Sequence, residues 1–574
     1  AAGVPDEAFQ ALEGDDKKVV AELKKQNRQQ RKGQETLFAG TLPALDTTGL
    51  AKTLVDLDRL DDDSLTAIRA KEERYEGLSR SAEYRRAKLV ADAWCAAFVC
   101  RKVPGVPAVT HDVFVRLSRD PESVPESLRT EIERLAAEYR FFHWHLAFPE
   151  VLNTAGGGEV AVGDGPGWTG GFDVVVGNPP WERLKLQEQE FFAARRSPEI
   201  AQAQNAAARR RMIDQLREDD PALHAAFLEA RRVAEGESHL VRNSGRYPLC
   251  GRGDVNTYAV FAETKRTLAG PRGRVGTIVP SGIATDDTTK QFFAEIMGSG
   301  ALVSLFEFEN EGFFLGAGQG HMVRFALTTL RGPVSDNATA LFLFQGKDVN
   351  EIREEDRTFA LTAEDLVLLN PNTRTCPIFR TRRDAEITKG IYRRVPVLIR
   401  EGPPEENPWG ISFLRMFDMT SDSHLFRTRA DLEAHGWQLE GNVFVRGGER
   451  YLPLYEAKMI SLFNHRFGDF SDGPEGQRAH ILPEVPESRL GDPNYQPLPF
   501  YWVPSTEVNA QLGAYPHRWL VGFRGITDSR ASARSVIIGV FPRAGVGNSL
   551  PILHIPGHTS SLVACLTAVL SGFV

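Results

Sequence analysis

The stretch FDVVVGNPPW, residues 172–181, limits what this chain can fold into more than any other segment. Its valine run is typical of a buried strand, and the strand must end at the two prolines because proline has no backbone N–H to donate to a sheet. Ligands of open α/β sheets bind just beyond the carboxyl ends of the strands. We therefore expect Asn178, Pro179, Pro180 and Trp181 to form a rigid corner at a binding edge.

Residues 255–330 alternate between helix and strand patterns. A helix pattern in NTYAVFAETKRTLAG precedes a strand pattern in GRVGTIVPSG, and a helix pattern in DTTKQFFAEIM precedes strand patterns in LVSLFEFEN and HMVRFALTTL. This order predicts part of a doubly wound, Rossmann-like α/β sheet with an antiparallel hairpin at its edge.

Three regions are expected along the chain. Apolar residues at three- and four-residue spacing predict a helical segment over residues 1–150, inserted in or packed on the sheet domain. Residues 151–335 are expected to contain the C-terminal half of that sheet domain. The alternation stops near residue 340, where proline, arginine and aromatic residues become frequent, so residues 336–574 are predicted to form a separate mixed α/β domain.

The corner offers hydrogen-bond acceptors to a planar amine such as the exocyclic nitrogen of adenine. The Asn178 side-chain oxygen can accept one N–H and the Pro179 carbonyl the other, which frees the lone pair of the nitrogen. The prolines hold both acceptors in place before a substrate arrives. Trp181 offers a face on which a flipped-out base would gain about 1–3 kcal/mol by stacking. A tight Asn-Pro turn with Trp181 in the core is the alternative.

With its flanking sequence, the corner resembles that of the gamma-type adenine-N6 DNA methyltransferases, in particular the long methylases of restriction-modification and phage-defence systems. The similar segments are FDVVVGNPPWERLKLQEQEFF, NTYAVFAETKRTLAGPRGRVGTIVPSG, and SLFEFENEGFF followed by HMVRFALTTL. The resemblance implies site-specific transfer of a methyl group from S-adenosylmethionine to a flipped adenine of double-stranded DNA. It implies that Asn178 and Pro179 orient the amine, that Trp181 stacks on the base, and that other subunits of such a system are possible partners.

The methyl-donor site of this family should open with a glycine-rich turn between a strand and a helix, upstream of the corner. Residues 1–170 show no such pattern, so we expect a fragment in which Asn178 contacts the donor and the other donor-binding residues lie upstream of Ala1. A permuted order is the alternative, with the donor turn in FLGAGQG at Phe314–Gly320.

Arginines suit both phosphate contact and the bidentate recognition of guanine. The segment FRTRRDAEITKGIYRRVPVLIR, residues 379–400, carries five that we expect to contact DNA within a target-recognition domain: Arg380, Arg382, Arg383, Arg393 and Arg394. A solvated face is the alternative, and the arginines between Arg524 and Arg534 are a second candidate.

Composition excludes several classes of protein. Five scattered cysteines indicate neither a zinc ribbon nor a disulfide framework, which fits the cytoplasm. No stretch approaches the ~18 apolar residues of a membrane span, so no membrane partner is expected. The acidic run DLDRLDDDSL and the pair His143 and His145 are better explained as surface and packing residues than as metal ligands, so no metal is predicted.

Two other functions compete with methyl transfer by this chain alone. Asp431, Glu456 and Lys458 could be the magnesium-binding set of a nuclease, which would make the chain part of a bifunctional restriction endonuclease-methylase. The chain could also be a non-catalytic DNA-recognition module. Such a module has no use for the corner at Asn178, so the corner argues against it.

Overall fold

The chain forms two compact units, Ala1–Pro396 and Val397–Val574. The computed structural model describes residues 3–37, 47–154, 167–203, 206–310, 313, 324–332, 338–472, 479, 481–527, 536–555 and 557–572. In these residues no helix is both long enough and apolar enough to cross a membrane.

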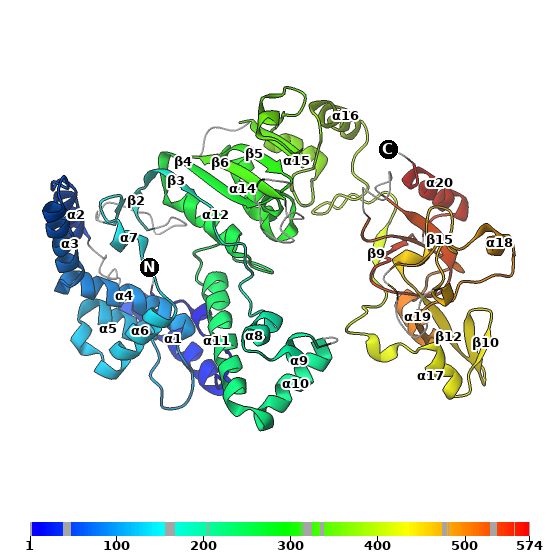
Figure 1. Ribbon diagram of the computed structural model, residues 1–574, viewed down its shortest axis with the longest axis horizontal. Coiled ribbons are helices and arrows are strands. Elements are labelled where there is room, and N and C mark those ends of the chain that lie inside the picture. Colours follow the sequence, from blue (N-terminus) through cyan, green and yellow to red (C-terminus); the bar gives the residue numbers. More distant parts are fainter. Residues whose placement is uncertain are drawn as a thin grey trace. The chain divides into compact units, whose positions relative to one another are not determined.

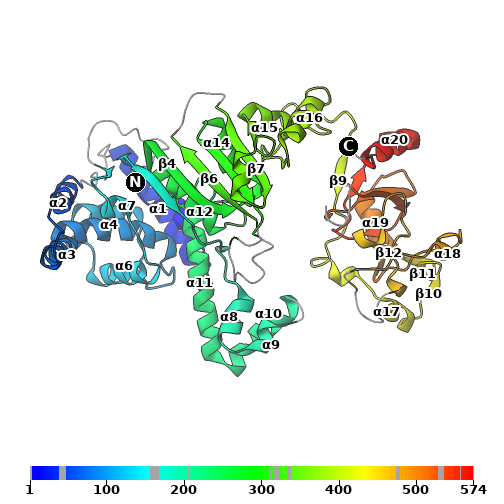
Figure 2. The ribbon, with the colours of Figure 1, turned by 45° about the horizontal axis from the view of Figure 1, so that its top comes forward.

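Residues 3–150 of the first unit are mainly helical. Their α-helices are α1 (Lys17–Leu37), α2 (Thr48–Asp58), α3 (Leu65–Ser79), α4 (Ala82–Val99), α5 (His111–Arg119), α6 (Glu126–Glu138) and α7 (Trp144–Ala147). Figure 2 shows α1, α4 and α6 gathered together, and the core that they form with α5 contains Phe98, Phe114 and Ile132. A second helical group follows the corner: α8 (Glu188–Ala194), α9 (Pro198–Ala201), α10 (Ala206–Asp219) and α11 (Pro221–Asn243).

Helix α11 ties the first residues of the chain to this helical region. Buried Arg232 forms an ion pair with Asp15 at 2.8 Å and also donates to the backbone carbonyls of Val99 and Cys100. Two turns further along α11, the Nε2 atom of buried His239 lies 3.1 Å from the carbonyl oxygen of Ala8. The polar groups of both side chains have partners inside the protein, so both residues have a structural role.

A six-stranded mixed sheet is the centre of the first unit. Its strand order is β3 (Phe172–Gly177), β4 (Ala269–Pro280), β6 (Phe325–Arg331), β5 (Leu302–Phe308), β7 (Ala340–Gly346) and β8 (Phe359–Leu361). Strand β3 is parallel to β4, whereas β6 is antiparallel to both β4 and β5. The predicted α/β class is therefore confirmed.

The predicted antiparallel hairpin exists, but its position at the edge is wrong. Strands β5 and β6 pair antiparallel as expected, yet β6 lies between β4 and β5 and the sheet continues through β7 to β8. The reason is that β7 carries Phe342, Leu343 and Phe344, all fully buried, which makes it an interior strand. The order of strands along the chain does not determine their order in the sheet.

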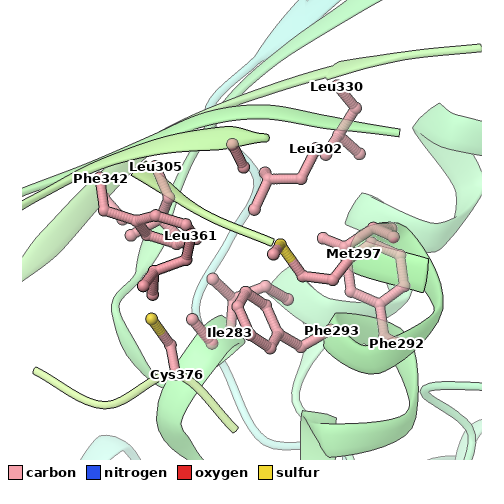
Figure 3. Packing of buried hydrophobic residues seen from close by; sticks show 14 of the residues in the cluster. Ile283, Phe292, Phe293, Met297, Leu302, Leu305, Leu330, Phe342, Leu361 and Cys376 are labelled. Atoms are coloured by element: carbon pink, nitrogen blue, oxygen red, sulfur yellow. The ribbon is translucent and has the colours of Figure 1, made fainter. Parts of the chain in front are cut away.

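Helices α12 (Thr257–Leu268) and α14 (Lys290–Gly298) lie against one face of the sheet (Figure 1). Figure 3 shows Phe292, Phe293 and Met297 of α14 packed beneath Leu302 and Leu305 of β5. All of these side chains are at most 3% exposed, so this layer is the main core of the unit.

The other face of β3 is open, which corrects the prediction of a buried strand. Val174 is 63% exposed and Val176 is 73% exposed, whereas Val175 packs against the core on the α12 side. Among the described strands, β3 pairs only with β4. Parallel strands normally have both faces covered. The described residues cover only the face of Val175, and the face with Val174 and Val176 is left exposed.

The boundary between the units lies after Pro396, not before residue 336 as predicted from the sequence. Strand β7 pairs with β5, and helices α15 (Ala363–Leu369) and α16 (Arg382–Tyr392) follow within the first unit. Leu366 and Ala385 of these helices belong to the core beneath the sheet. Tertiary packing therefore extends the sheet unit past the point where the helix-strand alternation ends.

The second unit is built on two mainly antiparallel sheets. One contains β10 (Gln438–Glu440), β11 (Val443–Arg446), β12 (Glu449–Tyr455) and β13 (Trp502–Pro504), with β16 (Gly545–Val546) parallel to β12. The other has the order β15 (Ile538–Pro542), β14 (Trp519–Phe523), β17 (Ile552–His554) and β9 (Ser412–Leu414). With α17 (Arg429–Ala434), α19 (Ser505–Leu512) and α20 (Ser560–Leu570), the unit is mixed α/β.

The attachment of the first residues to α11 should weaken in acid. Burial lowers the pKa of His239 to about 4, and its Nδ1 already accepts a hydrogen bond from Asn243, so a second ring proton would face a donor. The unfolded chain takes up a proton below pH ~6.5, whereas the folded one does so only near pH 4, so stability falls across this window. We expect a loss of about 1 kcal/mol between about pH 7 and about pH 5.5.

The measurement is the opening free energy of residues 3–16 from native-state hydrogen exchange. His239→Gln is the control, because glutamine keeps a donor and an acceptor and cannot become charged. The same loss in this variant would assign the pH dependence to another group.

Candidate active site

The corner follows β3 at the carboxyl end of the parallel pair β3 and β4, as the sequence predicts. Strand β3 ends at Gly177, whose register partner on β4 is Thr277. Asn178 is exposed directly after it, Pro179 is buried and Pro180 is exposed. The Asn178 amide is therefore accessible, whereas the backbone on its C-terminal side is fixed by proline geometry and by burial.

The first residue of α12 holds the chain where it leaves the corner. The Thr257 hydroxyl donates to the Pro180 carbonyl at 2.7 Å and accepts from the Glu182 N–H at 3.0 Å. The Thr257 N–H donates to the Glu182 carbonyl at 2.8 Å. Two residues on, the Leu184 N–H donates to the Val255 carbonyl at 3.0 Å. The segment after the prolines is thus bound to the start of α12 by backbone and hydroxyl groups.

A lysine of the same helix lies at the other side of the corner, and sequence reasoning missed it. Lys265 Nζ donates to the Gly177 carbonyl at 2.7 Å and to the Thr277 hydroxyl at 2.9 Å. The Thr277 hydroxyl donates in turn to the Gly177 carbonyl at 3.1 Å. Lys265 is buried, and this burial lowers the pKa of its ammonium group. Its position in the sequence could have identified it, because Lys265 falls on the same apolar face of the helix as Tyr258 and Ala262.

Trp181 is half-buried and packs against two core clusters, one beneath the sheet and one around Phe308 and Leu343. Its indole Nε1 is buried and has no acceptor among the residues that the structure describes. A buried N–H without a partner costs about 1–3 kcal/mol. Trp181 therefore contributes to the core, as the alternative interpretation holds, and also keeps part of its ring accessible.

A cavity of about 960 Å³ adjoins Trp181 within the first unit. The residues that line it include Tyr139, Phe141, Phe261 and Glu237. Burial raises the pKa of Glu237. The volume lies in the range of small-molecule sites, and the walls combine aromatic rings with a few polar groups.

The predicted DNA-binding arginines do not form one cluster. Arg382 and Arg383 begin α16, whereas Arg393 and Arg394 directly follow its end, about 16 Å away along the axis. All five arginines are exposed, with Arg380 just before the helix. They belong to the first unit, which corrects their placement in the C-terminal domain.

The aromatic residues among these arginines have structural roles. Phe379 is buried with its ring centroid 5.6 Å from that of Phe359, and Tyr392 packs against the core beneath the sheet. The second basic candidate is also partly structural, because the Arg524 guanidinium donates to the Ile460 carbonyl at 2.6 Å. The arginines at 530 and 534, like the predicted permuted donor turn at Phe314–Gly320, lie outside the described residues.

The proposed nuclease residues are engaged in local structure. Asp431 accepts from the Thr428 N–H at 3.0 Å and caps α17. Lys458 Nζ lies 3.3 Å from Glu456 and donates to the Ala479 carbonyl at 2.5 Å. Each of these charged groups therefore has a partner in its own neighbourhood.

The candidate metal ligands of the helical region also have other partners. His143 Nε2 lies 2.8 Å from buried Asp92, which also forms an ion pair with Lys88 at 2.5 Å. Burial lowers the pKa of His145 to about 4. The acidic group Asp61–Asp63 is exposed and precedes the capping residue of α3.

Part of this region matches a known family model. Residues 99–212, which contain the whole corner, match the model of the Eco57I restriction-modification methylase family. The match confirms the resemblance to restriction-modification methylases over this segment and supports a DNA methyltransferase. A search of curated proteins gave no match.

Three solved structures show distant similarity. They are the type IIL restriction-modification enzyme MmeI in complex with DNA (12% identity, TM-score 0.31, 70% of this chain and 42% of that one), a type I restriction-modification methyltransferase subunit from Streptococcus thermophilus (13%, 0.21, 50% and 51%), and the type IIG restriction endonuclease BpuSI (12%, 0.23, 59% and 41%). Such TM-scores do not establish a common fold. The chain spans about half or less of the length of these proteins.

Proposed function

We propose that this chain, of which residues 99–212 match the Eco57I restriction-modification methylase family, is the part of a DNA methyltransferase that presents adenine for N6 methylation. The observation that carries the proposal is the exposed Asn178 amide at the carboxyl end of β3, beside buried Pro179. A ligand can reach this amide, and the backbone around it is held on both sides by α12.

The chemistry follows from the acceptors at the corner. The Asn178 side-chain oxygen and the Pro179 carbonyl accept the two N–H groups of the adenine amine. Accepting both N–H groups localises the lone pair on the nitrogen and makes it nucleophilic. With a methyl donor bound, the new N–C bond would replace the methyl–sulfur bond of the donor, and the nitrogen would then lose one proton. Because the backbone that carries both acceptors is held before binding, less reorganisation is needed during the reaction.

S-adenosylmethionine would supply the methyl group. Next to the corner, the described residues offer one group for it, Asn178, and no glycine turn between a strand and a helix on the open side of β3. These residues alone therefore do not build a donor site. We expect the remaining donor-binding groups to approach the open side of β3, where Val174 and Val176 are exposed.

Double-stranded DNA is the proposed substrate, with the adenine flipped out of the helix. The net charge of −8 gives no general attraction to phosphates, so local groups must supply it. The exposed arginines at the two ends of α16 are the candidates in the first unit. For the second unit we propose recognition of the target sequence. A recognition module without catalysis would not need the braced Asn178.

Replacement of Asn178 tests the reaction. Asn178→Ala, in the protein expressed from its complete gene, should lower methyl transfer to DNA by at least about a hundredfold, because one fixed acceptor is lost. DNA affinity should stay within about twofold, since it comes mostly from phosphate contacts. The assay is transfer of a radiolabelled methyl group, with Asn350→Ala at an exposed site as the matched control. Methylation by the Asn178 variant at the control's rate would refute the assignment.

Replacement of Trp181 separates stacking from packing. Trp181→Phe should retain base flipping, because a smaller ring still stacks, and Trp181→Ala should lose most of it. The probe is 2-aminopurine at the target position, whose fluorescence rises when it leaves the duplex. Both variants will lose some stability, because Trp181 packs against the core. Equal fluorescence gain in the alanine variant and the wild type would leave Trp181 with packing alone.

Replacement of the arginines tests phosphate contact. If Arg382 and Arg383 bind phosphates, changing both to alanine should weaken binding to all sequences alike and reduce the slope of log affinity against log salt by ~2. The same change at Arg393 and Arg394 is the comparison, because this pair lies at the opposite end of α16. Binding isotherms at several salt concentrations on target and scrambled duplexes give the slopes. Unchanged slopes for both pairs would mean that α16 does not contact DNA.

A further inference from the structure

We propose that Lys265 is a positioning residue that acts through the Gly177 carbonyl to hold Asn178 in its reactive orientation, an inference that rests on the proposed function. The geometry is a closed triangle of hydrogen bonds. Lys265 Nζ contacts the Gly177 oxygen and the Thr277 hydroxyl, and that hydroxyl contacts the same Gly177 oxygen. The last carbonyl before the corner thus accepts two donors at once, one of them charged.

This triangle fixes the peptide plane that enters Asn178. The Gly177 carbonyl and the Asn178 N–H belong to one planar peptide unit, so immobilising the oxygen also fixes the direction of the Asn178 N–Cα bond. On the other side, Pro179 restricts the backbone of the residue before it. Asn178 is therefore constrained at both of its peptide bonds, and its side chain keeps only its own rotations.

The identity of the residue points to a role beyond packing. Lys265 is 8% exposed, and burial is the one cause that shifts the pKa of its ammonium group. Among the described residues, its hydrogen-bond partners are a carbonyl and a hydroxyl, both neutral. Burying a cation on neutral partners is costly, and an apolar residue of similar length would fill the position more cheaply. The charge is placed where it strengthens the hydrogen bond to the Gly177 oxygen.

The contact between Lys265 and the backbone also restricts which residue can occupy position 177. A Cβ atom on Gly177 would lie 3.2 Å from Lys265 Nζ, closer than most such contacts. The glycine therefore allows the ammonium group to approach the backbone directly. Together with Thr257 on the exit side, α12 contacts the corner at both ends.

Lys265→Met tests the inference, because methionine keeps the length and removes the charge. In the protein expressed from its complete gene, we expect kcat for DNA methylation to fall between about tenfold and a hundredfold, because displacement of a reacting group by about 1 Å has such effects. KM for DNA should stay within about twofold, since phosphate contacts dominate it. Hydrogen exchange of residues 176–182 should accelerate while the exchange of β5 and β7 stays unchanged.

Two further variants keep the test decisive. Thr277→Val removes one corner of the triangle with little change in volume and should lower kcat in the same direction by a smaller factor. Lys290→Met on α14 is the matched control, because its ammonium group forms a partly exposed ion pair with Asp287. It should leave both kcat and the exchange of residues 176–182 unchanged.

The outcomes separate this inference from the proposed function. Unchanged kcat and unchanged exchange in Lys265→Met would overturn it, and so would a loss confined to KM. If Lys265→Met does not fold, an unaltered kcat in Thr277→Val would overturn it instead. If the wild-type protein methylates no adenine, the proposed function fails, and the exchange of residues 176–182 still decides whether Lys265 holds the corner.

Discussion

The parallel pairing of β3 with β4 is the contact on which the candidate site depends. It sets Gly177 opposite Thr277, and this register brings the Gly177 carbonyl within reach of a side chain from β4 and another from α12. Helix α12 leads directly into β4, so the helix that contacts the corner and the strand that pairs with β3 are one continuous segment. A shift of β3 by one residue would exchange the faces of every side chain on it and remove these contacts.

The sequence was sufficient to locate the strand and the corner because proline and asparagine have strong local preferences. A valine run can continue as a strand only until the first residue that cannot donate to the ladder, so β3 has to end before Pro179, and it ends at Gly177. Helix α12 was predictable for a similar reason, since its apolar residues repeat at helical spacing and Asn256 caps its start. These features depend on neighbours in the chain.

The parts that the sequence did not predict depend on distant contacts. The local sequence pattern does not determine that β6 lies between β4 and β5, or that β7 extends the sheet past residue 336. Phe379 and Tyr392 follow the pattern of aromatics among arginines, yet both are bound into the core by residues far along the chain. Lys265 was overlooked because a charge in a helix is normally solvated, and only the tertiary structure reveals a buried one.

The open edge of β3 has a consequence for handling the protein. Unpaired strand edges present backbone N–H and C=O groups to any other extended chain, and natural proteins usually protect them with charges, prolines or a covering element. On β3 the exposed side chains at the centre of the strand are Val174 and Val176, and valine favours extended pairing. Since β3 pairs only with β4 among the described strands, we expect this chain, purified alone at high concentration, to self-associate through the other edge of β3. Arginine in the buffer or a charged substitution at Val176 would be the first remedy for its solubility.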